Sequence, residues 1–595
     1  MSEAPRIEYS RRLKALRGDE SRFEHRHRSL GIATLLAGVA ALILGILALW
    51  SRSASIIWPV LAVIGIAVFA VLNERAIRGR QRCRRAIAFH ERGIARLEDR
   101  WIGTGETGDR FLEESHPYSR DLDLFGNGSL FELLCTARTQ AGEETLARWL
   151  LHAADPVEVH RRQEAISDLR DRLDLREGLA VLGEDVRLGV HPETLAAWGE
   201  GDPWLVLMLL RILLGVLGVL WLVAAVAAIV WGQVLFLLVV TAINFAISYQ
   251  FRRHLDSAIP PIEEAAHDLQ LLSKVLARFE SENFTAPKLV DLQNALRRQG
   301  IPPSRSIARL NRRTDLVDSR DQLAIKVIDP FIFWALQSTL AVEAWRKEFG
   351  PSIRQWLVAV GEMEALSSLA SYAYENPADV FPDFAGTAPC FDAQDFAHPL
   401  IPESRAIRND LKLDSDLRLI VISGPNMAGK STFIRAVGLN AVLAQCGAPV
   451  RAHRLRLSPL AIGASVCILD SLQGGISRFY AEIKRLKQIS DLTKAPSSVL
   501  FLLDELLQGT NSHDRRIAAA AVVRNLVDQG AIGLITTHDL ALTKIVDGLA
   551  PLAANAHFED RIENGLLLFD HRLRSGIVQT SNALDLMRSI GLDVD

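Results

Sequence analysis

The chain has 595 residues, more than one hydrophobic core usually serves, so it contains several structural units. Its 67 Lys and Arg residues are balanced by 70 Asp and Glu residues, which argues against a global basic field that attracts polyanions. Five scattered cysteines without a Cys-x-x-Cys pair indicate neither a disulfide framework nor a zinc site. A mean hydropathy of +0.14 favours a chain with membrane-spanning segments.

Two apolar runs near the N-terminus predict a membrane hairpin. Residues 30–50 carry no charge, and about 20 helical residues cross a hydrocarbon core. Residues 56–72 are short and contain Pro59, so they are plausible only as the return arm of the hairpin. The predicted segments are a basic N-terminus at 1–28, a transmembrane hairpin at 29–73 and a basic helical connector at 74–114.

A second apolar pair, residues 204–231 and 234–249, predicts another hairpin with Gly232 and Gln233 at its turn. Arg211 would cost about 3 kcal/mol at the bilayer midplane, but near the start of its segment it can snorkel to the surface. The alternative for both pairs is a buried hairpin in a large soluble core, which rarely needs such long uncharged runs.

Basic residues flank both hairpins on one side: eight Lys or Arg in residues 1–28 and nine Arg in residues 74–100 flank the first, and Arg252 and Arg253 follow the second. By the positive-inside rule, both hairpins enter from the cytoplasm, which leaves every large segment there. We interpret the basic stripe at 74–100 as a helix beside anionic lipid rather than as a nucleic-acid site. The expected location is the inner or plasma membrane, with multiple passes.

Helical patterns at 115–203 and 252–376 predict one helical domain, which the second hairpin at 204–251 interrupts. Within it, the sequence predicts helices at residues 129–138 and 143–152. The breaks are expected at Pro287, Pro302-Pro303 and Pro351.

After Pro377, short β-like runs alternate with turns and predict an α/β domain at 377–595. Residues 417–422 are expected to form a buried strand that leads directly into a GxxxxGKS motif, and this strand-loop-helix context is the one that a phosphate-binding loop requires. The predicted nucleotide-binding residues are Gly424, Pro425, Asn426, Met427, Ala428, Gly429, Lys430, Ser431 and Thr432.

Phosphate binding explains the residue types in this loop. Gly424 and Gly429 let backbone N–H groups approach phosphates at a helix N-terminus, and Lys430 brings a positive charge to the outer phosphates. Ser431 is expected to ligate Mg²⁺. The motif therefore predicts ATP and Mg²⁺ as cofactors.

Two later strand ends supply the remaining catalytic candidates. Residues 498–503 form an apolar strand that ends in Asp504, expected to hold Mg²⁺, and Glu505, expected to orient and deprotonate the attacking water. Residues 531–537 form another apolar run that ends in His538, which can sense the γ-phosphate from a neighbouring strand end. The alternative for Glu505 is a solvated acid at the end of a strand, and the alternative for His538 is a structural histidine.

These motifs resemble the MutS family more than P-loop proteins at large. The loop is similar to the family's GPNMGGKST, with Ala428 in place of one glycine, and the strand with Asp504 continues in a loop similar to DEIGRGTST. Residues 470–482 resemble the family's D-L-x-x-G-x-S-x-F-x-x-E signature. His398-Pro399 and Asn409-Asp410 stand where the family has its HP and ND elements.

The resemblance covers residues 115–200 and 260–595, and it implies a lever domain ahead of the ATPase domain. It also implies a homodimer with composite ATP sites, in which Ser477 reaches the γ-phosphate of the partner's ATP. DNA binding is the role inherited from the family. However, a basic flank and a hairpin stand where the family has its mismatch-reading domain, and the second hairpin largely replaces the clamp, so mismatch-specific reading is not expected.

The complete prediction is an α/β P-loop NTPase domain of ABC/MutS-like type at the C-terminus, preceded by an all-α lever domain, with two transmembrane helical hairpins. Its expected function is that of a membrane-anchored ATP hydrolase that works as a conformational switch, with DNA binding related to mismatch repair or damage sensing. One alternative is an ABC-type transporter, because residues 472–475 resemble an LSGGQ loop, although no polar pathway crosses the apolar runs. The other is a membrane scaffold with a degenerate ATPase.

Overall fold

The computed structural model describes eight stretches of the chain: residues 3–50, 57–202, 208–319, 323–425, 428–466, 478–507, 512–563 and 566–578. Packing divides the chain into two compact units. The first unit comprises residues 1–136, 146–172 and 366–595, and the second comprises residues 137–145 and 173–365.

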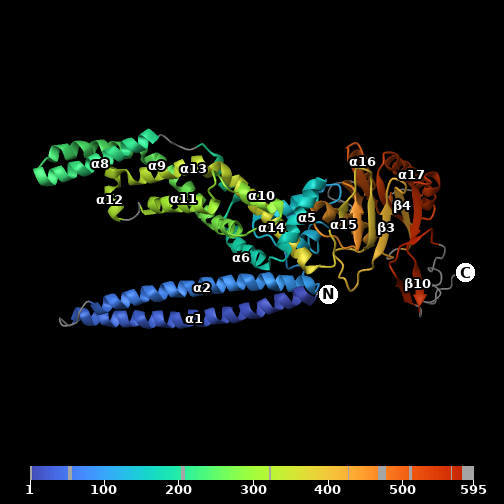
Figure 1. Ribbon diagram of the computed structural model, residues 1–595, viewed down its shortest axis with the longest axis horizontal. Coiled ribbons are helices and arrows are strands. Elements are labelled where there is room, and N and C mark those ends of the chain that lie inside the picture. Colours follow the sequence, from blue (N-terminus) through green and yellow to red (C-terminus); the bar gives the residue numbers. More distant parts are fainter. Residues whose placement is uncertain are drawn as a thin grey trace. The chain divides into compact units, whose positions relative to one another are not determined.

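The first unit begins with two long antiparallel helices, α1 (Glu3–Trp50) and α2 (Ile57–Leu97) (Figure 1). Each joins an apolar run to a basic segment in one continuous helix, as the sequence predicted for residues 74–100. Pro59 lies in the first turn of α2, where its missing N–H leaves no helical hydrogen bond unmade. The basic halves are joined by ion pairs such as Arg17–Glu91 at 2.7 Å, whereas the apolar halves leave large side chains exposed, including Leu35.

Four helices in the described part of the chain are long and apolar enough to cross a membrane. They are α1, α2, α8 (Met208–Trp231) and α9 (Val234–Glu280). Gly232 and Gln233 separate α8 from α9, as the sequence predicted. A bent pair of helices in the second unit would be a fifth candidate.

The second unit is built from helices, and two of them begin at the predicted proline breaks. Pro287 starts α10 and Pro303 starts α11, because proline fits the first turn of a helix. Pro351 lies in a short 3₁₀ turn. Besides α8 and α9, the helices are α6 (Leu173–Gly189), α7 (Pro192–Glu200), α10 (Pro287–Ala295), α11 (Pro303–Asp318), α12 (Leu323–Ile332), α13 (Trp334–Phe349) and most of α14 (Ile353–Glu375).

The helix predicted at residues 129–138 is shorter than expected, since α3 comprises Leu130–Leu134. Ser129 caps its start by accepting the Glu132 N–H. The helix ends because Cys135 has an extended backbone and the Thr136 N–H donates to Ser368 Oγ at 3.1 Å instead of to a helical carbonyl. The neighbouring helices are α4 (Gln140–Leu151), which overlaps the helix predicted at 143–152, and α5 (Pro156–Arg170).

A six-stranded sheet with the order β12-β9-β4-β8-β7-β6 forms the centre of the α/β domain. Its strands are β4 (Leu419–Ser423), β6 (Leu460–Ser465), β7 (Ser498–Leu503), β8 (Ile532–Thr537), β9 (Ala553–His557) and β12 (Arg574–Ser575). All neighbours are parallel except β12 and β9. Because β8 lies between β4 and β7, the carboxyl ends of these three strands meet at one edge, where ligands of such sheets bind.

Helices cover both faces of this sheet: α15 (Lys430–Cys446), α16 (Arg478–Leu492) and α17 (Ser512–Asp528). Phe501 of β7 packs in one core with Ile489 of α16 and Val523 of α17. The next side chain, Leu502, points the other way, and Gly438 of α15 approaches it so closely that an added Cβ would lie 2.9 Å from Leu502 Cδ1. The alternation therefore places α16 and α17 on the face opposite α15.

A smaller sheet takes three of its strands from the residues between Pro377 and the phosphate-binding loop, in agreement with the short β-like runs predicted there, and its fourth strand follows α15. Its order is β1-β5-β2-β3. The strands are β1 (Asp383–Phe384), β2 (Phe391–Phe396), β3 (Asn409–Leu413) and β5 (Arg454–Leu457). An antiparallel ribbon of β10 (Asp560–Glu563) and β11 (Leu566–Phe569) follows β9.

Candidate nucleotide-binding site

The phosphate-binding loop connects β4 to α15. Gly424 and Gly429 have φ values of +150° and +99°, which side chains rarely adopt. A Cβ on Gly424 would lie 2.8 Å from the Phe558 carbonyl oxygen, so the loop requires glycine there. Lys430 is buried, and its Nζ donates to the carbonyl oxygens of Gly424 at 2.7 Å and Pro425 at 3.0 Å. These two carbonyl groups of the loop therefore hold the ammonium group.

The two candidate carboxylates follow the carboxyl end of β7. Asp504 accepts a hydrogen bond from the Thr536 hydroxyl of β8. The Glu505 N–H donates to the Thr536 carbonyl oxygen at 3.2 Å. Glu505 has a φ of +50°, and such strained backbone is concentrated at functional sites. Its Oε1 lies 3.9 Å from Lys430 Nζ.

His538 directly follows β8, between the phosphate-binding strand and the carboxylate strand. Its Nδ1 lies 3.4 Å from Glu505 Oε1. The structure thus brings together Lys430, Glu505 and His538, and it holds Asp504 beside them through β8. Parallel packing of β4, β8 and β7 causes this convergence.

The structure says less about the other predicted site residues, which include the candidate Mg²⁺ ligand Ser431. Ser431 and Thr432 are exposed on the first turn of α15. Among the described residues, no group of three or more His, Cys, Asp or Glu side chains could hold a metal ion by itself. Asn426, Met427 and Ser477 lie outside the residues that the structure describes.

Burial lowers the pKa of Lys430, and the carboxylates of Glu505 and Asp504 oppose this shift. A bound triphosphate would add negative charge and favour the charged ammonium further. Burial, together with Arg435 and Arg451, lowers the pKa of His398 to about 4. The His398 imidazole is therefore neutral at physiological pH.

A pocket of about 220 Å³ adjoins the loop at Gly429. His571 forms part of its wall, and the Nδ1 of this histidine lies 2.9 Å from the Ala428 carbonyl oxygen. The Asn409 side-chain amide donates to the His571 carbonyl oxygen at 3.1 Å. Most of the remaining wall is apolar or aromatic, including Phe396, Ile407, Phe433 and Phe558. A flat heteroaromatic ring attached to phosphates suits this pocket.

The sequence analysis did not assign His571 to the site. This residue follows the β10–β11 ribbon, far along the chain from the loop that it contacts. A lone histidine after a short strand has no local pattern that predicts a binding role. The Asn409-Asp410 element was noted as a resemblance, and its contact with His571 gives it a physical role in shaping the pocket.

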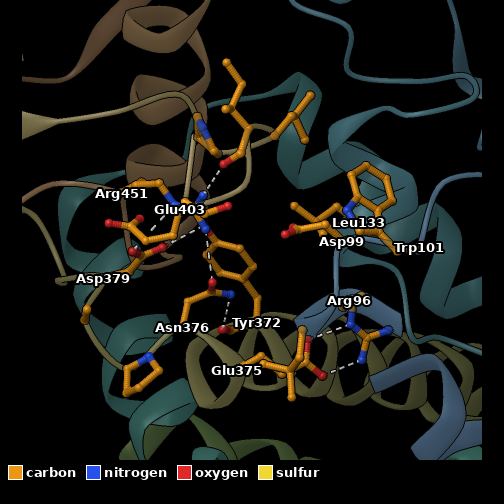
Figure 2. Close-up of a pocket in the computed structure, with 17 residues that line it drawn as sticks. Arg96, Asp99, Trp101, Leu133, Tyr372, Glu375, Asn376, Asp379, Glu403 and Arg451 are labelled. Carbon is orange, nitrogen blue, oxygen red and sulfur yellow. Dashed lines mark hydrogen bonds and ion pairs between the residues drawn. The ribbon is translucent and has the colours of Figure 1, made fainter. Parts of the chain in front are cut away.

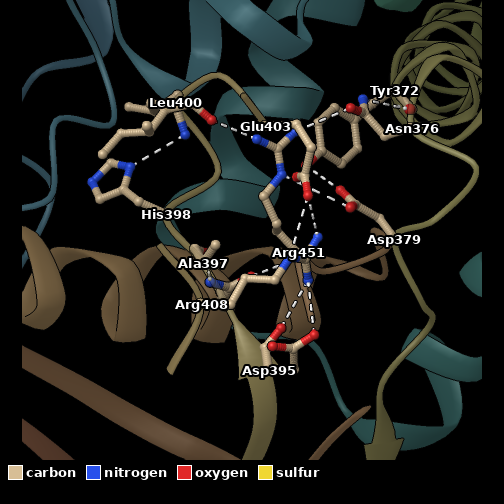
Figure 3. Close-up of polar contacts among 12 residues, drawn as sticks. Tyr372, Asn376, Asp379, Asp395, Ala397, His398, Leu400, Glu403, Arg408 and Arg451 are labelled. Carbon is tan, nitrogen blue, oxygen red and sulfur yellow. Dashed lines mark hydrogen bonds and ion pairs between the residues drawn. The ribbon is translucent and has the colours of Figure 1, made fainter. Parts of the chain in front are cut away.

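Arg451 joins three parts of the first unit next to this pocket (Figure 3). Its backbone N–H donates to Asn440 Oδ1 of α15 at 2.9 Å, and its Nη1 donates to the Ile401 carbonyl oxygen at 2.6 Å. Its Nη2 donates to Asn376 Oδ1 at 3.1 Å, and its Nε lies 3.8 Å from Asp379 Oδ1. Arg451 thus connects the helix of the phosphate-binding loop to the residues that follow α14.

A second cavity, of about 470 Å³, lies where Arg451, the end of α14 and the end of α2 meet (Figure 2). Here Glu375, in the last turn of α14, accepts hydrogen bonds from Arg96 Nε and Nη2, both at 2.6 Å. The Tyr9 hydroxyl donates to the same carboxylate at 3.0 Å. Since Glu375 and Tyr9 are buried, both N-terminal helices are tied firmly to the end of α14.

We expect Glu375→Ala to destabilise this junction by about 3–5 kcal/mol, because it leaves the Arg96 guanidinium buried without its carboxylate. The matched control is Glu91→Ala, which removes the exposed Arg17–Glu91 pair between α1 and α2 and should cost about 1 kcal/mol or less. Thermal unfolding of the detergent-solubilised protein measures both. Equal losses in the two variants would contradict a stabilising junction at Glu375.

Comparison with known families identifies the domain that carries the site. Residues 420–594 match the family model described as MutS domain V. The matched range begins in β4 and includes the phosphate-binding loop, both carboxylates and His538. The predicted resemblance to the MutS family is confirmed for this domain, which is a P-loop ATPase-like α/β domain.

Individual relatives agree with the assignment of domain V. Endonuclease MutS2 of Thermus thermophilus is 34% identical over 203 residues, which are 33% of this chain and 25% of that protein. DNA mismatch repair protein MutS of Geobacillus thermodenitrificans is 30% identical over 261 residues, which are 43% of this chain and 28% of that protein. The chain therefore spans about a quarter of the length of these curated relatives.

Proposed function

We propose that this protein is a membrane-anchored ATPase that works as an ATP-driven conformational switch. The observation that carries the proposal is the convergence of Lys430, Glu505 and His538 at one edge of the domain V sheet. This arrangement has the parts that phosphoryl transfer needs: a cation for the phosphates, a carboxylate for the attacking water and a group that can sense the γ-phosphate.

The side chains present fit a Mg²⁺–ATP complex. Lys430 would bind the outer phosphates, and Ser431 and Asp504 would hold Mg²⁺, which would neutralise charge on the phosphates. Glu505 orients the attacking water and accepts its proton. The pocket bounded by His571 takes the adenine base. Two chains form a homodimer with composite sites, in which Ser477 completes the partner's site.

The polar contacts around Arg451 and Glu375 support a coupling role for the N-terminal hairpin. Arg451 contacts α15 through Asn440, and the end of α14 carries Glu375, which holds Arg96 of α2. A shift of α15 upon nucleotide binding would therefore act on a buried polar network that reaches α1 and α2. ATP binding is proposed to change the position of these helices in the membrane.

The membrane assignment is supported by the exposed apolar surfaces of α1, α2, α8 and α9. We expect tags at both termini and within residues 101–200 to be accessible from the cytoplasm. Tags in residues 51–55 and 232–233 should be accessible from the opposite side. Protease accessibility in intact and inverted vesicles measures this topology. A protein that fractionates as soluble without detergent would refute the spans.

DNA is the proposed partner of the switch, because the relatives with a similar domain V are named for DNA mismatch repair. The test is the ATPase rate of the purified full-length protein with homoduplex, mismatched and branched DNA. We expect DNA to change the rate by at least about fivefold, the size of a typical coupling free energy. Mismatched DNA should change the ATPase rate no more than homoduplex DNA does. No response to any of the three DNAs would exclude the DNA role and leave the ATPase assignment standing.

A further inference from the structure

The second unit contains a sharp bend between α12 and α13. Helical residues on either side of Phe333 meet at 72°. Pro330 lacks the N–H that would continue the helix, and Phe333 has a left-handed φ of +58°. Such a break leaves backbone carbonyl groups without helical partners, and hydrocarbon offers no water to bind them.

Side chains of α9 supply those partners. The buried Asn244 donates from Nδ2 to the Phe331 carbonyl oxygen at 2.7 Å, and Ser248 Oγ donates to the Pro330 carbonyl oxygen at 2.8 Å. The Phe331 ring also stacks on Trp221 of α8, with ring centroids 5.0 Å apart. The bend is therefore built into the second apolar hairpin.

These contacts set the depth of the bend. Asn244 lies ten residues after Val234, about 15 Å along α9, which is near the middle of a hydrocarbon core of about 30 Å. The bend reaches this depth at Phe331, and Leu336 and Leu340 of α13 then return beside Leu214 of α8. If the second apolar hairpin spans a membrane, this geometry makes α12 and α13 a re-entrant element, which enters and leaves on the same side.

A pocket of about 390 Å³ lies between this element and α9. Its deeper wall is apolar and includes Phe245 and Tyr249, whose side chains are largely exposed along α9. Its charged lining consists of Arg252, Asp256, Lys326 and Asp329. One oxygen of Asp329 accepts the Ala335 N–H at 2.7 Å, so this carboxylate is partly used within the protein.

The two basic residues lie where phospholipid phosphates would be. Arg252 follows Asn244 by eight residues, about 12 Å along α9, which places it near the boundary between hydrocarbon and head groups. Lys326 faces the same pocket from α12. Both are exposed, and within the described stretches of the chain neither forms an ion pair.

We propose that this pocket binds a membrane phospholipid, with the phosphodiester between Arg252 and Lys326 and an acyl chain along Phe245 and Tyr249. The apolar wall and the charged rim match the two ends of such a molecule. The proposal rests on the membrane placement given under the proposed function. It adds a specific lipid site that fastens the re-entrant element to α9.

The test uses the full-length protein in nanodiscs that contain phosphatidylethanolamine and phosphatidylglycerol, with retained lipid counted by native mass spectrometry. The wild type should retain a phospholipid, and Arg252→Gln and Lys326→Gln should each reduce its occupancy at least fivefold. Arg253→Gln is the matched control, because Arg253 is the exposed basic neighbour that does not line the pocket. It should retain lipid as the wild type does.

Several outcomes would overturn the site. Equal losses of bound lipid in Arg252→Gln and Arg253→Gln would mean that a basic flank attracts lipid in general. Full retention of lipid in all variants would mean that the pocket is not a lipid site. Displacement of the lipid by soluble glycerophosphate at millimolar concentration would assign the pocket to a free phosphate instead. Alkaline extraction of membranes separates this inference from the proposed function. If the wild-type protein is extracted from the membrane, the membrane anchor is refuted. If the wild-type protein stays in the membrane but Arg252→Gln and Lys326→Gln bind lipid as it does, only the lipid site is refuted.

Discussion

Glu505→Gln should bind ATP normally and hydrolyse it at least about 100-fold more slowly, which is the usual contribution of a positioned general base. The substitution keeps the shape of the side chain and leaves Asp504 and Lys430 in place. It removes the carboxylate whose Oε1 lies 3.9 Å from Lys430 Nζ and 3.4 Å from His538 Nδ1. Equilibrium binding of ATP and single-turnover hydrolysis measure the two effects separately.

Lys430→Ala is the contrasting variant. It removes the ammonium group that the Gly424 and Pro425 carbonyl oxygens hold inside the loop, so nucleotide binding itself should weaken. Unchanged turnover in Glu505→Gln would exclude Glu505 as the base. Normal nucleotide affinity in Lys430→Ala would contradict the phosphate-binding role of the loop.

The centre of the candidate site could be predicted because its residues follow buried strands. The apolar run at residues 498–503 corresponds to β7, and the runs at 417–422 and 531–537 overlap β4 and β8. Parallel strands present their carboxyl ends at one edge, so three separate runs predict one meeting point. The proximity of Glu505 and His538 follows from this rule.

The parts that could not be predicted depend on contacts between distant residues. His571 lines the pocket beside Gly429 through the path of an antiparallel ribbon, which no periodic pattern encodes. Arg96 was interpreted only as part of a lipid-facing basic stripe. Its pairing with Glu375 needs the end of α14 to lie beside α2, and the local sequence gives no sign of that.

The bend at Phe333 could not be predicted from the sequence for a different reason. The apolar stretch of α12 is only 10 residues long, too short for a predicted span, and it contains Lys326 and Asp329. Its packing against the second apolar hairpin is recognised only from the contacts by which Asn244 and Ser248 bind the carbonyl groups of the break. Polar residues within an apolar helix are thus informative once their partners are known.

A mixed dimer should recover activity that each of its parent mutants lacks. The prediction concerns Ser477, which lies immediately before α16, and the composite site that the family resemblance implies. Glu482 of α16 accepts the Leu507 N–H, so α16 contacts the residues that follow Asp504 and Glu505. Lys430→Ala and Ser477→Ala homodimers should each be nearly inactive, because both of their sites carry one defect.

In a heterodimer of these two chains, one site carries both defects and the other carries neither. The heterodimer should therefore recover up to about half of the wild-type turnover, since one of the two symmetric sites is intact. Purification through two different tags followed by an ATPase assay measures the recovery, and a heterodimer of Lys430→Ala with wild-type chains shows whether one intact site works beside a defective one. If that control is active while the doubly tagged mutant heterodimer stays inactive, Ser477 and Lys430 act within the same chain and the composite site is wrong.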